Sequence, residues 1–335
     1  ANPSGIQCDG CGVINAGRTT LTTGKAEVEN GELKGYRVKG GKVTVGQKGM
    51  DNSQSDYTDI IAEKAEIKGG VWSKKGIKVT TGKNNVDRTN DSVVYVGDKI
   101  TDKTDHTSDT QGENQSYSVD VSQLGGMYAE KIHLVDNGQG LGVRNAGHIG
   151  AAAGEVKIDS QGKIVNEGFI GGSENTQLNA KKNIENRGTV YAKAQAQLNA
   201  QNIDNKQGVI AGKQVQLSAN NVDNRKQSDK GSLIVASDKV SVKAKNVDNQ
   251  GTKANSKTEQ GIRGAQVAII ADNLSNQQGG IYTDEHANLN MTKTIDNKDG
   301  EIEASKSIEL TAKTLANDGS VKTKGDLTVH LQDGL

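Results

Sequence analysis

Asparagines recur along the last two-thirds of the chain at nearly equal intervals. Nine of them stand 19 to 27 residues apart, and a Val, Ile or Leu lies two positions before each. The nine are Asn145, Asn166, Asn186, Asn205, Asn224, Asn249, Asn276, Asn297 and Asn317. A fixed period near 20 residues indicates one structural unit stacked on copies of itself. Because each unit holds short alternating apolar and polar stretches and no helical stripe, the period predicts the coils of a parallel β-helix.

Each of these asparagines begins a tight turn, usually as Asn-x-Gly, since both residue types tolerate the left-handed backbone conformation of a sharp corner. In a stack of coils the corner recurs every ~4.8 Å, so we expect the asparagine amides to form a hydrogen-bonded ladder. We also expect three aliphatic columns inside, represented by Val143, Ile149 and Leu178. A leucine-rich repeat needs denser leucines and a helical half, and a left-handed β-helix has a period of about six residues. Neither alternative fits the spacing.

The composition narrows the class of protein. The chain carries 41 basic and 41 acidic side chains, and this zero net charge argues against a general nucleic-acid binder. Hydrophobic residues make up 32% of the chain, and with the 42 glycines the apolar share is close to that of globular proteins. This share is compatible with a narrow core that extends along an axis. No apolar run is long enough to span a membrane, so we expect no stable membrane insertion. The chain opens on Ala1-Asn2-Pro3 without a signal peptide, and we expect it to be a piece of something longer.

The first 140 residues are less regular, but they also contain short strands that alternate with glycine turns. Short strands are expected within residues 41–46, 60–67 and 76–82. Residues 83–118 break the pattern, and we expect them to form a β-hairpin excursion with a polar tip at 101–116. Two polar insertions, residues 225–232 and 252–261, are expected to be surface loops on the same side of the stack.

Cys8 and Cys11 form a C-x-x-C motif. A zinc site would need further ligands that the sequence does not supply, and a thioredoxin-like role needs a strand–helix context that is missing. A disulfide that closes a turn is favoured over two free thiols.

Three aspartates, Asp204, Asp223 and Asp248, each precede one of the regularly spaced asparagines. If they stack, their carboxylates form a column that resembles the calcium-dependent sites of β-helical polysaccharide lyases. The alternative is a set of solvated turn residues whose charge is relieved by Lys206 and Arg225. The second interpretation is favoured, so no metal, no cofactor and no catalytic residue is predicted.

Two longer motifs carry a family resemblance. The stretch Asn2-Pro3-Ser4-Gly5-Ile6, together with residues 8–24, resembles the latter half of the secretion domain of two-partner-secretion exoproteins. Residues 119–151 are similar to the junction at which that domain passes into haemagglutinin-type repeats. The families are the filamentous haemagglutinins and the contact-dependent growth-inhibition exoproteins. Their turn is usually Asn-Pro-Asn-Gly, and Ser4 stands where the second asparagine is expected.

The resemblance implies a right-handed β-helix. It implies that residues 1–140 are the C-terminal part of the secretion domain and that residues 141–335 are repeats of about 20 residues. It also implies export through the periplasm to the cell surface by an outer-membrane transporter of the Omp85 type with periplasmic receptor domains. We expect the turn Asn2, Pro3, Ser4, Gly5 and Ile6 to be the secretion-recognition element.

The sequence therefore predicts a segment of a large secreted exoprotein that forms a rigid extracellular filament for cell–cell contact, either growth inhibition or adhesion. A target-cell receptor or glycan would be its other partner. One alternative is an adhesin that contacts host glycans through residues 101–116, 225–232 and 252–261. The other is a polysaccharide-degrading enzyme that uses the aspartate column, and the lack of a catalytic constellation disfavours it.

Overall fold

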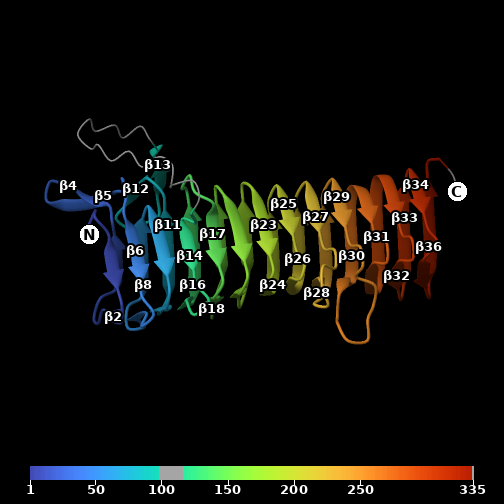
Figure 1. Ribbon diagram of the computed structural model, residues 1–335, viewed down its shortest axis with the longest axis horizontal. Coiled ribbons are helices and arrows are strands. Elements are labelled where there is room, and N and C mark those ends of the chain that lie inside the picture. Colours follow the sequence, from blue (N-terminus) through green and yellow to red (C-terminus); the bar gives the residue numbers. More distant parts are fainter. Residues whose placement is uncertain (98–115, 334–335) are drawn as a thin grey trace. The chain divides into compact units, whose positions relative to one another are not determined.

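The computed structural model describes residues 1–97 and 116–333, and within these residues it contains strands and no helix. The fold is a parallel β-solenoid, as the period predicts (Figure 1). The chain divides into two compact units, unit 1 with residues 1–173 and 179–181 and unit 2 with residues 174–178 and 182–335. The division falls within β22 (Thr176–Ala180). No helix of the described residues is long and apolar enough to cross a membrane.

Unit 1 is built from three columns of parallel strands. The first column contains β1 (Ile6–Cys8), β6 (Lys42–Val45), β9 (Lys64–Ile67), β14 (Val119–Val121), β17 (Gly142–Asn145) and β20 (Lys163–Asn166). The second contains β2 (Cys11–Gly12), β7 (Met50–Asn52), β10 (Gly70–Ser73), β15 (Gly126–Ala129), β18 (His148–Ala151) and β21 (Phe169–Gly172). The third contains β3 (Arg18–Thr22), β8 (Tyr57–Ala62), β11 (Gly76–Thr81), β16 (Lys131–Asp136) and β19 (Val156–Ser160).

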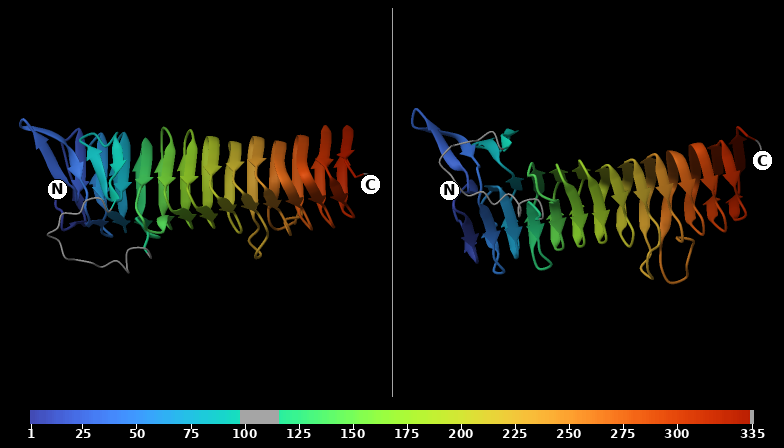
Figure 2. Two further views of the ribbon diagram at one scale, coloured as in Figure 1. Left: turned by 90° about the horizontal axis from the view of Figure 1, so that it is seen from above. Right: turned by 45° about the horizontal axis from the view of Figure 1, so that its top comes forward.

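A four-stranded antiparallel sheet leaves the coils of unit 1 (Figures 1 and 2). Its strands are β4 (Lys25–Glu29), β5 (Glu32–Arg37), β12 (Asn84–Asp87) and β13 (Val93–Tyr95). The predicted hairpin at 83–118 is therefore present in β12 and β13, whereas its tip at 101–116 lies almost entirely outside the described residues. The hairpin of β4 and β5, which pairs with β12, was not predicted from the sequence. Buried Tyr36, Val38, Ile61 and Val86 attach this sheet to the coils.

Unit 2 repeats the same coil with longer strands. Short strands carry the residues before each turn: β23 (Asn183–Asn186), β25 (Asn202–Asp204), β27 (Asn221–Asp223), β29 (Asn246–Asp248) and β34 (Thr314–Ala316). The other faces consist of β24 (Thr189–Asn199), β26 (Val209–Ser218), β28 (Leu233–Lys243), β30 (Gly261–Ser275), β31 (Gly280–Asp296), β32 (Glu301–Ala304), β33 (Ser307–Ala312), β35 (Ser320–Thr323) and β36 (Asp326–Leu331). Bulges such as that between Gly264 and Gln266 bend the long strands, so that one strand serves two faces.

The predicted aliphatic columns fill the interior. In unit 2 the residue before the turn pairs in register from coil to coil, as in Ile203 with Val222 and Val222 with Val247, and all three are at most 1% exposed. The column after the turn is equally buried, as Ile210 and Ile281 illustrate. Because strand residues alternate between faces, each coil buries aliphatic side chains inward and presents polar ones outward.

The predicted asparagine ladder is present and lies inside the coils. Asn145, Asn166, Asn186, Asn205, Asn224, Asn249, Asn276 and Asn297 are all fully buried. Within each unit asparagine amides donate to the next asparagine, as Asn145 Nδ2 does to Asn166 Oδ1 at 3.0 Å and Asn205 Nδ2 to Asn224 Oδ1 at 2.9 Å. The same nitrogen donates to the carbonyl oxygens of Gly208 and Leu233, so the buried amide is satisfied on several sides.

The two inserted loops of unit 2 contact each other, as expected for loops on one side of the stack (Figures 1 and 2). Thr258 Oγ1 donates to the carbonyl oxygen of Asp229 at 3.4 Å. The bases of the loops are fixed by Ser232 and Thr252, both fully buried, whose hydroxyl groups donate to the carbonyl oxygens of Arg225 and Asn249.

Candidate functional site in the opening coil

The predicted recognition turn is a β-turn with a sequence suited to it. The nitrogen of Gly5 donates to the carbonyl oxygen of Asn2 at 3.1 Å, and Asn2 Oδ1 accepts from the nitrogen of Ser4 at 3.2 Å. Asn at the first position, Pro at the second and Gly at the fourth are the residues that favour such a turn. Gly5 adopts a φ of 127°, a value that an L side chain rarely tolerates. The turn is therefore rigid by composition.

The turn is attached to the coil at both sides and remains exposed. The nitrogen of Asn2 donates to the carbonyl oxygen of Thr22 at 2.9 Å. The carbonyl oxygen of Pro3 lies against Gly41, where an added Cβ would approach it to 2.6 Å. Residues Asn2, Pro3 and Ser4 are exposed. A partner can bind a rigid, exposed turn of this kind without any rearrangement of the coil.

The strands that follow the turn form the first coil. Within the described residues β1, β2 and β3 each pair with one neighbouring strand, namely β6, β7 and β8. Between β2 and β3 the side chain of Ile14 is 75% exposed and that of Val13 is 37% exposed. Leu21 lies within β3 opposite Ile60. This coil therefore presents apolar side chains at the surface.

Cys8 and Cys11 are joined by a disulfide in this coil, with their Cα atoms 5.6 Å apart. Cys8 is 4% exposed, and the bond closes the corner between β1 and β2. The carboxylate of Asp9 in the same corner accepts from the nitrogen of Lys48 at 2.8 Å. The corner is thus fixed to the second coil.

An ion pair between exposed Arg18 and buried Asp59, which no sequence pattern indicated, connects the first coil with the antiparallel sheet. Arg18 Nη1 lies 2.6 Å from Asp59 Oδ2 and donates to the carbonyl oxygen of Thr89 at 3.0 Å. Asn90, at a φ of 60°, is fully buried, and its Oδ1 accepts from Thr80 Oγ1 at 2.8 Å. Lys78 Nζ donates to the carbonyl oxygen of Asn90. Burial raises the pKa of Asp59 above its ordinary value, although Arg18 opposes the rise.

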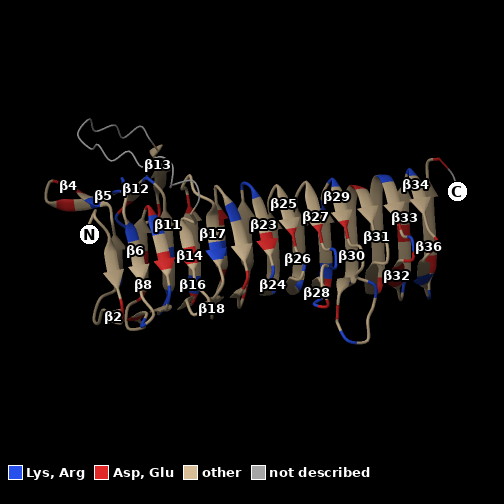
Figure 3. Ribbon diagram, in the orientation of Figure 1, with Lys and Arg blue, Asp and Glu red and all other residues tan. Residues whose placement is uncertain are grey.

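The three predicted aspartates are brought together in unit 2. Asp204 pairs in register with Asp223, and Asp223 with Asp248. Cationic side chains lie between them, with Arg187 2.7 Å from Asp204, Lys206 3.5 Å from Asp204 and 3.6 Å from Asp223, and Arg225 2.8 Å from Asp223 and 3.5 Å from Asp248. Figure 3 shows basic and acidic residues interspersed along these coils.

The negative charges of this column are neutralised by the neighbouring arginine and lysine side chains. Burial opposes the ionisation of Asp223, but hydrogen bonds from Arg225 outweigh it and hold the pKa of Asp223 below its ordinary value. Burial raises the pKa of Asp248, which Arg225 offsets in part. Because the carboxylate oxygens are occupied by Arg and Lys, this arrangement favours a surface ion-pair ladder over a calcium site.

Two further ladders of stacked side chains were not predicted from the sequence. On the outside of unit 2, Asn202 donates to Asn183 at 3.0 Å and Asn221 to Asn202 at 2.6 Å, and the row continues through Asn246 and Asn273. Its signal was an asparagine three positions before the buried one. In unit 1 the rings of Trp72, Tyr128, His148 and Phe169 stack at centroid distances of 4.1, 5.4 and 4.6 Å.

The comparisons with known proteins concern the same part of the chain. The sequence model of the TPS secretion domain matches residues 1–166. Toxin CdiA of Yersinia pestis is 41% identical over 194 residues, which cover 58% of this chain and 6% of that protein. A tRNA nuclease CdiA of Yersinia mollaretii is 37% identical over 167 residues, which cover 49% of this chain and 5% of that protein. A tRNA nuclease CdiA of Escherichia coli is 36% identical over 177 residues, which cover 52% of this chain and 5% of that protein. No significant match was found among solved structures.

The matched region includes the exposed turn, the first coil, the disulfide corner and the first two asparagines of the buried ladder, Asn145 and Asn166. A parallel β-solenoid is also what the sequence resemblance implied. Residues 1–166 belong to the TPS secretion domain family, and the chain is a structural segment of a secreted two-partner-secretion exoprotein.

Proposed function

We propose that the opening coil is the part of this exoprotein that its outer-membrane transporter recognises. The observation that carries the proposal is the match of residues 1–166 to the TPS secretion domain, a region that includes the exposed turn at Asn2, Pro3 and Ser4. The transporter is of the Omp85 type, and its periplasmic receptor domains meet the exoprotein before it crosses the outer membrane.

The recognition works through backbone pairing and a few apolar contacts. Strand addition needs free backbone donors and acceptors and little side-chain specificity. This mode is supported by the exposed side chain of Ile14, which lies between β2 and β3. The turn fixes the position of β1, since it is tied to Thr22 at the end of β3.

The coils of unit 2 serve as an extracellular stalk. Each coil offers a strand edge and an asparagine amide on which the next coil forms, so the exported chain folds by addition of one unit to another. The relatives named toxin CdiA and tRNA nuclease CdiA favour growth inhibition over host adhesion as the task of the whole protein. The segment itself is not an enzyme, and its partner on the target cell is a surface receptor or glycan.

Export of the exoprotein from its own bacterium tests the proposal. Asn2→Ala combined with Pro3→Ala should reduce the secreted fraction strongly, measured as exoprotein in the medium and on the cell surface relative to the total. The matched control is Asn255→Ala, because Asn255 is also exposed and its Oδ1 also accepts from the backbone nitrogen two residues later. That control should leave secretion unchanged.

A second pair of variants separates recognition from stalk building. Deletion of residues 186–223 removes two repeats and places Asn224 where Asn186 stood, so the register is kept. Export should continue with a shortened filament. If this deletion blocks export while the turn variant is exported normally, the recognition element is not the opening turn and the proposal is wrong.

A further inference from the structure

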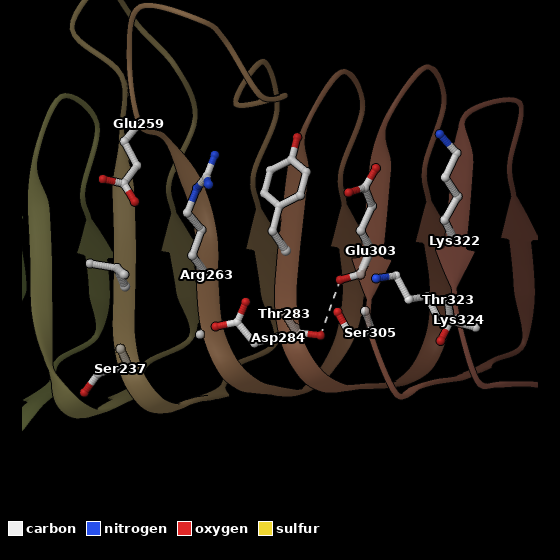
Figure 4. A pocket seen from close by; sticks show the side chains of 15 residues that line it. Ser237, Glu259, Arg263, Thr283, Asp284, Glu303, Ser305, Lys322, Thr323 and Lys324 are labelled. Carbon is white, nitrogen blue, oxygen red and sulfur yellow. Dashed lines mark hydrogen bonds between the residues drawn. The ribbon is translucent and has the colours of Figure 1, made fainter.

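Polar side chains also gather at two places outside the opening turn and the aspartate column. One is a hollow of about 740 Å³ on unit 2 (Figure 4). It is lined by three cations and three carboxylates, Arg263, Lys322, Lys324, Glu259, Asp284 and Glu303. Because the two signs balance, this lining selects neither an anionic nor a cationic ligand. The other place is in unit 1, where the loop between β12 and β13 meets β8 and β11, and the groups there are able to react with one another.

The cluster in unit 1 surrounds a single asparagine of that loop. Asn90 is fully buried and adopts a φ of 60°. Its Oδ1 accepts from Thr80 Oγ1 at 2.8 Å, and its Nδ2 donates to Asp59 Oδ1 at 3.5 Å. Lys78 Nζ donates to the backbone carbonyl oxygen of the same asparagine. An amine, an amide and a carboxyl group therefore meet at one residue.

The strand register brings these groups together. Lys78 on β11 pairs with Asp59 on β8, and Thr80 stands two residues after Lys78 on the same side of β11. The nitrogen of Asn90 donates to the carbonyl oxygen of Asp87 at 3.1 Å, which tightens the loop above them. The fold therefore holds the groups in place before any reaction. Such preorganisation makes an intramolecular reaction much faster than its bimolecular counterpart.

Lys78 is placed as a nucleophile. Its side chain is partly buried, and within the described residues its amine makes no ion pair and donates to a neutral carbonyl oxygen. Burial lowers the pKa of Lys78, and the negative charges of Asp91, Asp59 and Asp87 oppose this fall. A lysine amine that is withdrawn from water is more often neutral, and the neutral amine is the nucleophile.

We propose that Lys78 and Asn90 become joined by an amide bond between their side chains, an isopeptide bond. Nζ of Lys78 attacks Cγ of Asn90, and the new C–N bond replaces the bond between Cγ and Nδ2. Asp59 takes a proton from Nζ and returns one to Nδ2, which leaves as ammonia. The Thr80 hydroxyl stabilises the negative charge that develops on Oδ1. An amine and a primary amide thus give a secondary amide and ammonia, so the reaction balances without a further reactant.

The bond links β11 of the coils to the loop between β12 and β13. Arg18 already holds this loop through the carbonyl oxygen of Thr89. The covalent link makes the attachment permanent, because the antiparallel sheet can then leave the coils only if a covalent bond breaks. This modification is independent of the proposed recognition by the transporter.

Mass spectrometry of the purified and reduced chain tests the proposal. The measured mass should be lower than that of the sequence by one molecule of ammonia. After digestion with trypsin, peptide 76–83, uncut at Lys78, should be found joined to peptide 89–99. A succinimide at Asn30 or Asn137, each followed by glycine, also releases ammonia but joins no peptides, so the digest separates the two reactions. A chain of full mass, or a digest without the joined peptides, overturns the proposal.

Matched lysine variants identify the reacting amine. Lys78→Arg keeps the positive charge and the donor, but it should have the full mass of its sequence. Lys75→Arg is the control, because Lys75 is an exposed lysine of the same coil that pairs with Asp56. This control should still lack one ammonia. If Lys78→Arg retains the loss of ammonia, or Lys75→Arg abolishes it, the assignment of Lys78 is wrong.

Asp59→Asn tests the proton transfer. The amide cannot carry the proton, so the yield of joined peptides should decrease roughly tenfold or more at equal times after purification. Asp51→Asn, at an exposed position, should leave the yield unchanged. If circular dichroism shows that Asp59→Asn does not fold, Thr80→Val provides the same test through the loss of the donor to Oδ1. An unchanged yield in the folded variant would contradict the assigned chemistry. Export does not enter these measurements, so their failure would leave the proposed role of the opening coil untouched.

Discussion

Arg18 and Asp59 form an ion pair across two coils, with 2.6 Å between Nη1 and Oδ2, although Asp59 is only 2% exposed. The same arginine donates to the carbonyl oxygen of Thr89 in the loop between β12 and β13. The pair therefore holds the antiparallel sheet against the coils of unit 1. A buried carboxylate that keeps one cation becomes very unfavourable when that cation is removed.

Replacement of this arginine should destabilise unit 1. Arg18→Ala leaves Asp59 buried without its cation, and we expect a loss of about 3 kcal/mol in the free energy of unfolding. Urea unfolding followed by the fluorescence of Trp72, the single tryptophan of the chain, measures it. Lys34→Ala removes the exposed pair with Glu32 and should change stability by less than ~0.5 kcal/mol. Equal effects would show that the burial of Asp59 gives its ion pair with Arg18 no greater contribution to stability than an exposed pair.

A second buried carboxylate should make the stability of unit 1 depend on pH. Asp136 is 1% exposed and accepts from Thr81, Ser160 and the nitrogen of Gly138. Burial raises its pKa above the ordinary 3.8. Its protonated form is favoured by folding, so its contribution to stability is greatest below the ordinary pKa and is lost as pH rises through the raised one.

The variant Asp136→Asn removes this titration. The stability of the wild type minus that of the variant should therefore decrease from about pH 4 to about pH 7. Urea unfolding at both pH values, again followed by Trp72, gives the difference. A difference that is constant or increases with pH would contradict the assigned direction.

The fold could be predicted from the sequence because every coil has the same physical requirements. Ile203 and Asn205 recur at a fixed spacing and a glycine such as Gly208 usually follows within three residues, since each coil needs an interior aliphatic residue, a buried amide and a sharp corner. Arg18 and Asp59 occur once and lie far apart in the chain, so no period indicates them. The hairpin of β4 and β5 escaped for the same reason, because its partner β12 lies beyond two intervening coils.

The site was partly predictable on the same grounds. The turn at Asn2, Pro3 and Gly5 has a composition that determines its conformation locally, and Asp204 and Asp223 shared a repeat position. Whether Cys8 and Cys11 are oxidised also depends on the compartment and stays a prediction.

The two cysteines should form a disulfide in material made in an oxidising compartment. Their Cα atoms are 5.6 Å apart, a separation at which a disulfide forms readily. Thiol counting on unfolded protein should find none before reduction and two after it. The variant Cys11→Ser provides the control, since it should show one thiol without reductant. Two thiols in unreduced wild-type protein would contradict the prediction.

The two asparagine ladders of unit 2 should differ in their importance for stability. Asn205→Ala should destabilise the unit by about 2–4 kcal/mol, because it removes one acceptor of Asn186 and the donor to Asn224, Gly208 and Leu233 inside the coil. Asn221→Ala interrupts the outer ladder in the same way, but Asn221 is exposed, and water replaces the lost partners. Its effect should stay below about 1 kcal/mol. Thermal and urea unfolding followed by far-UV circular dichroism compares the two variants. Comparable losses would mean that the ladder itself, and not its burial, stabilises the coils.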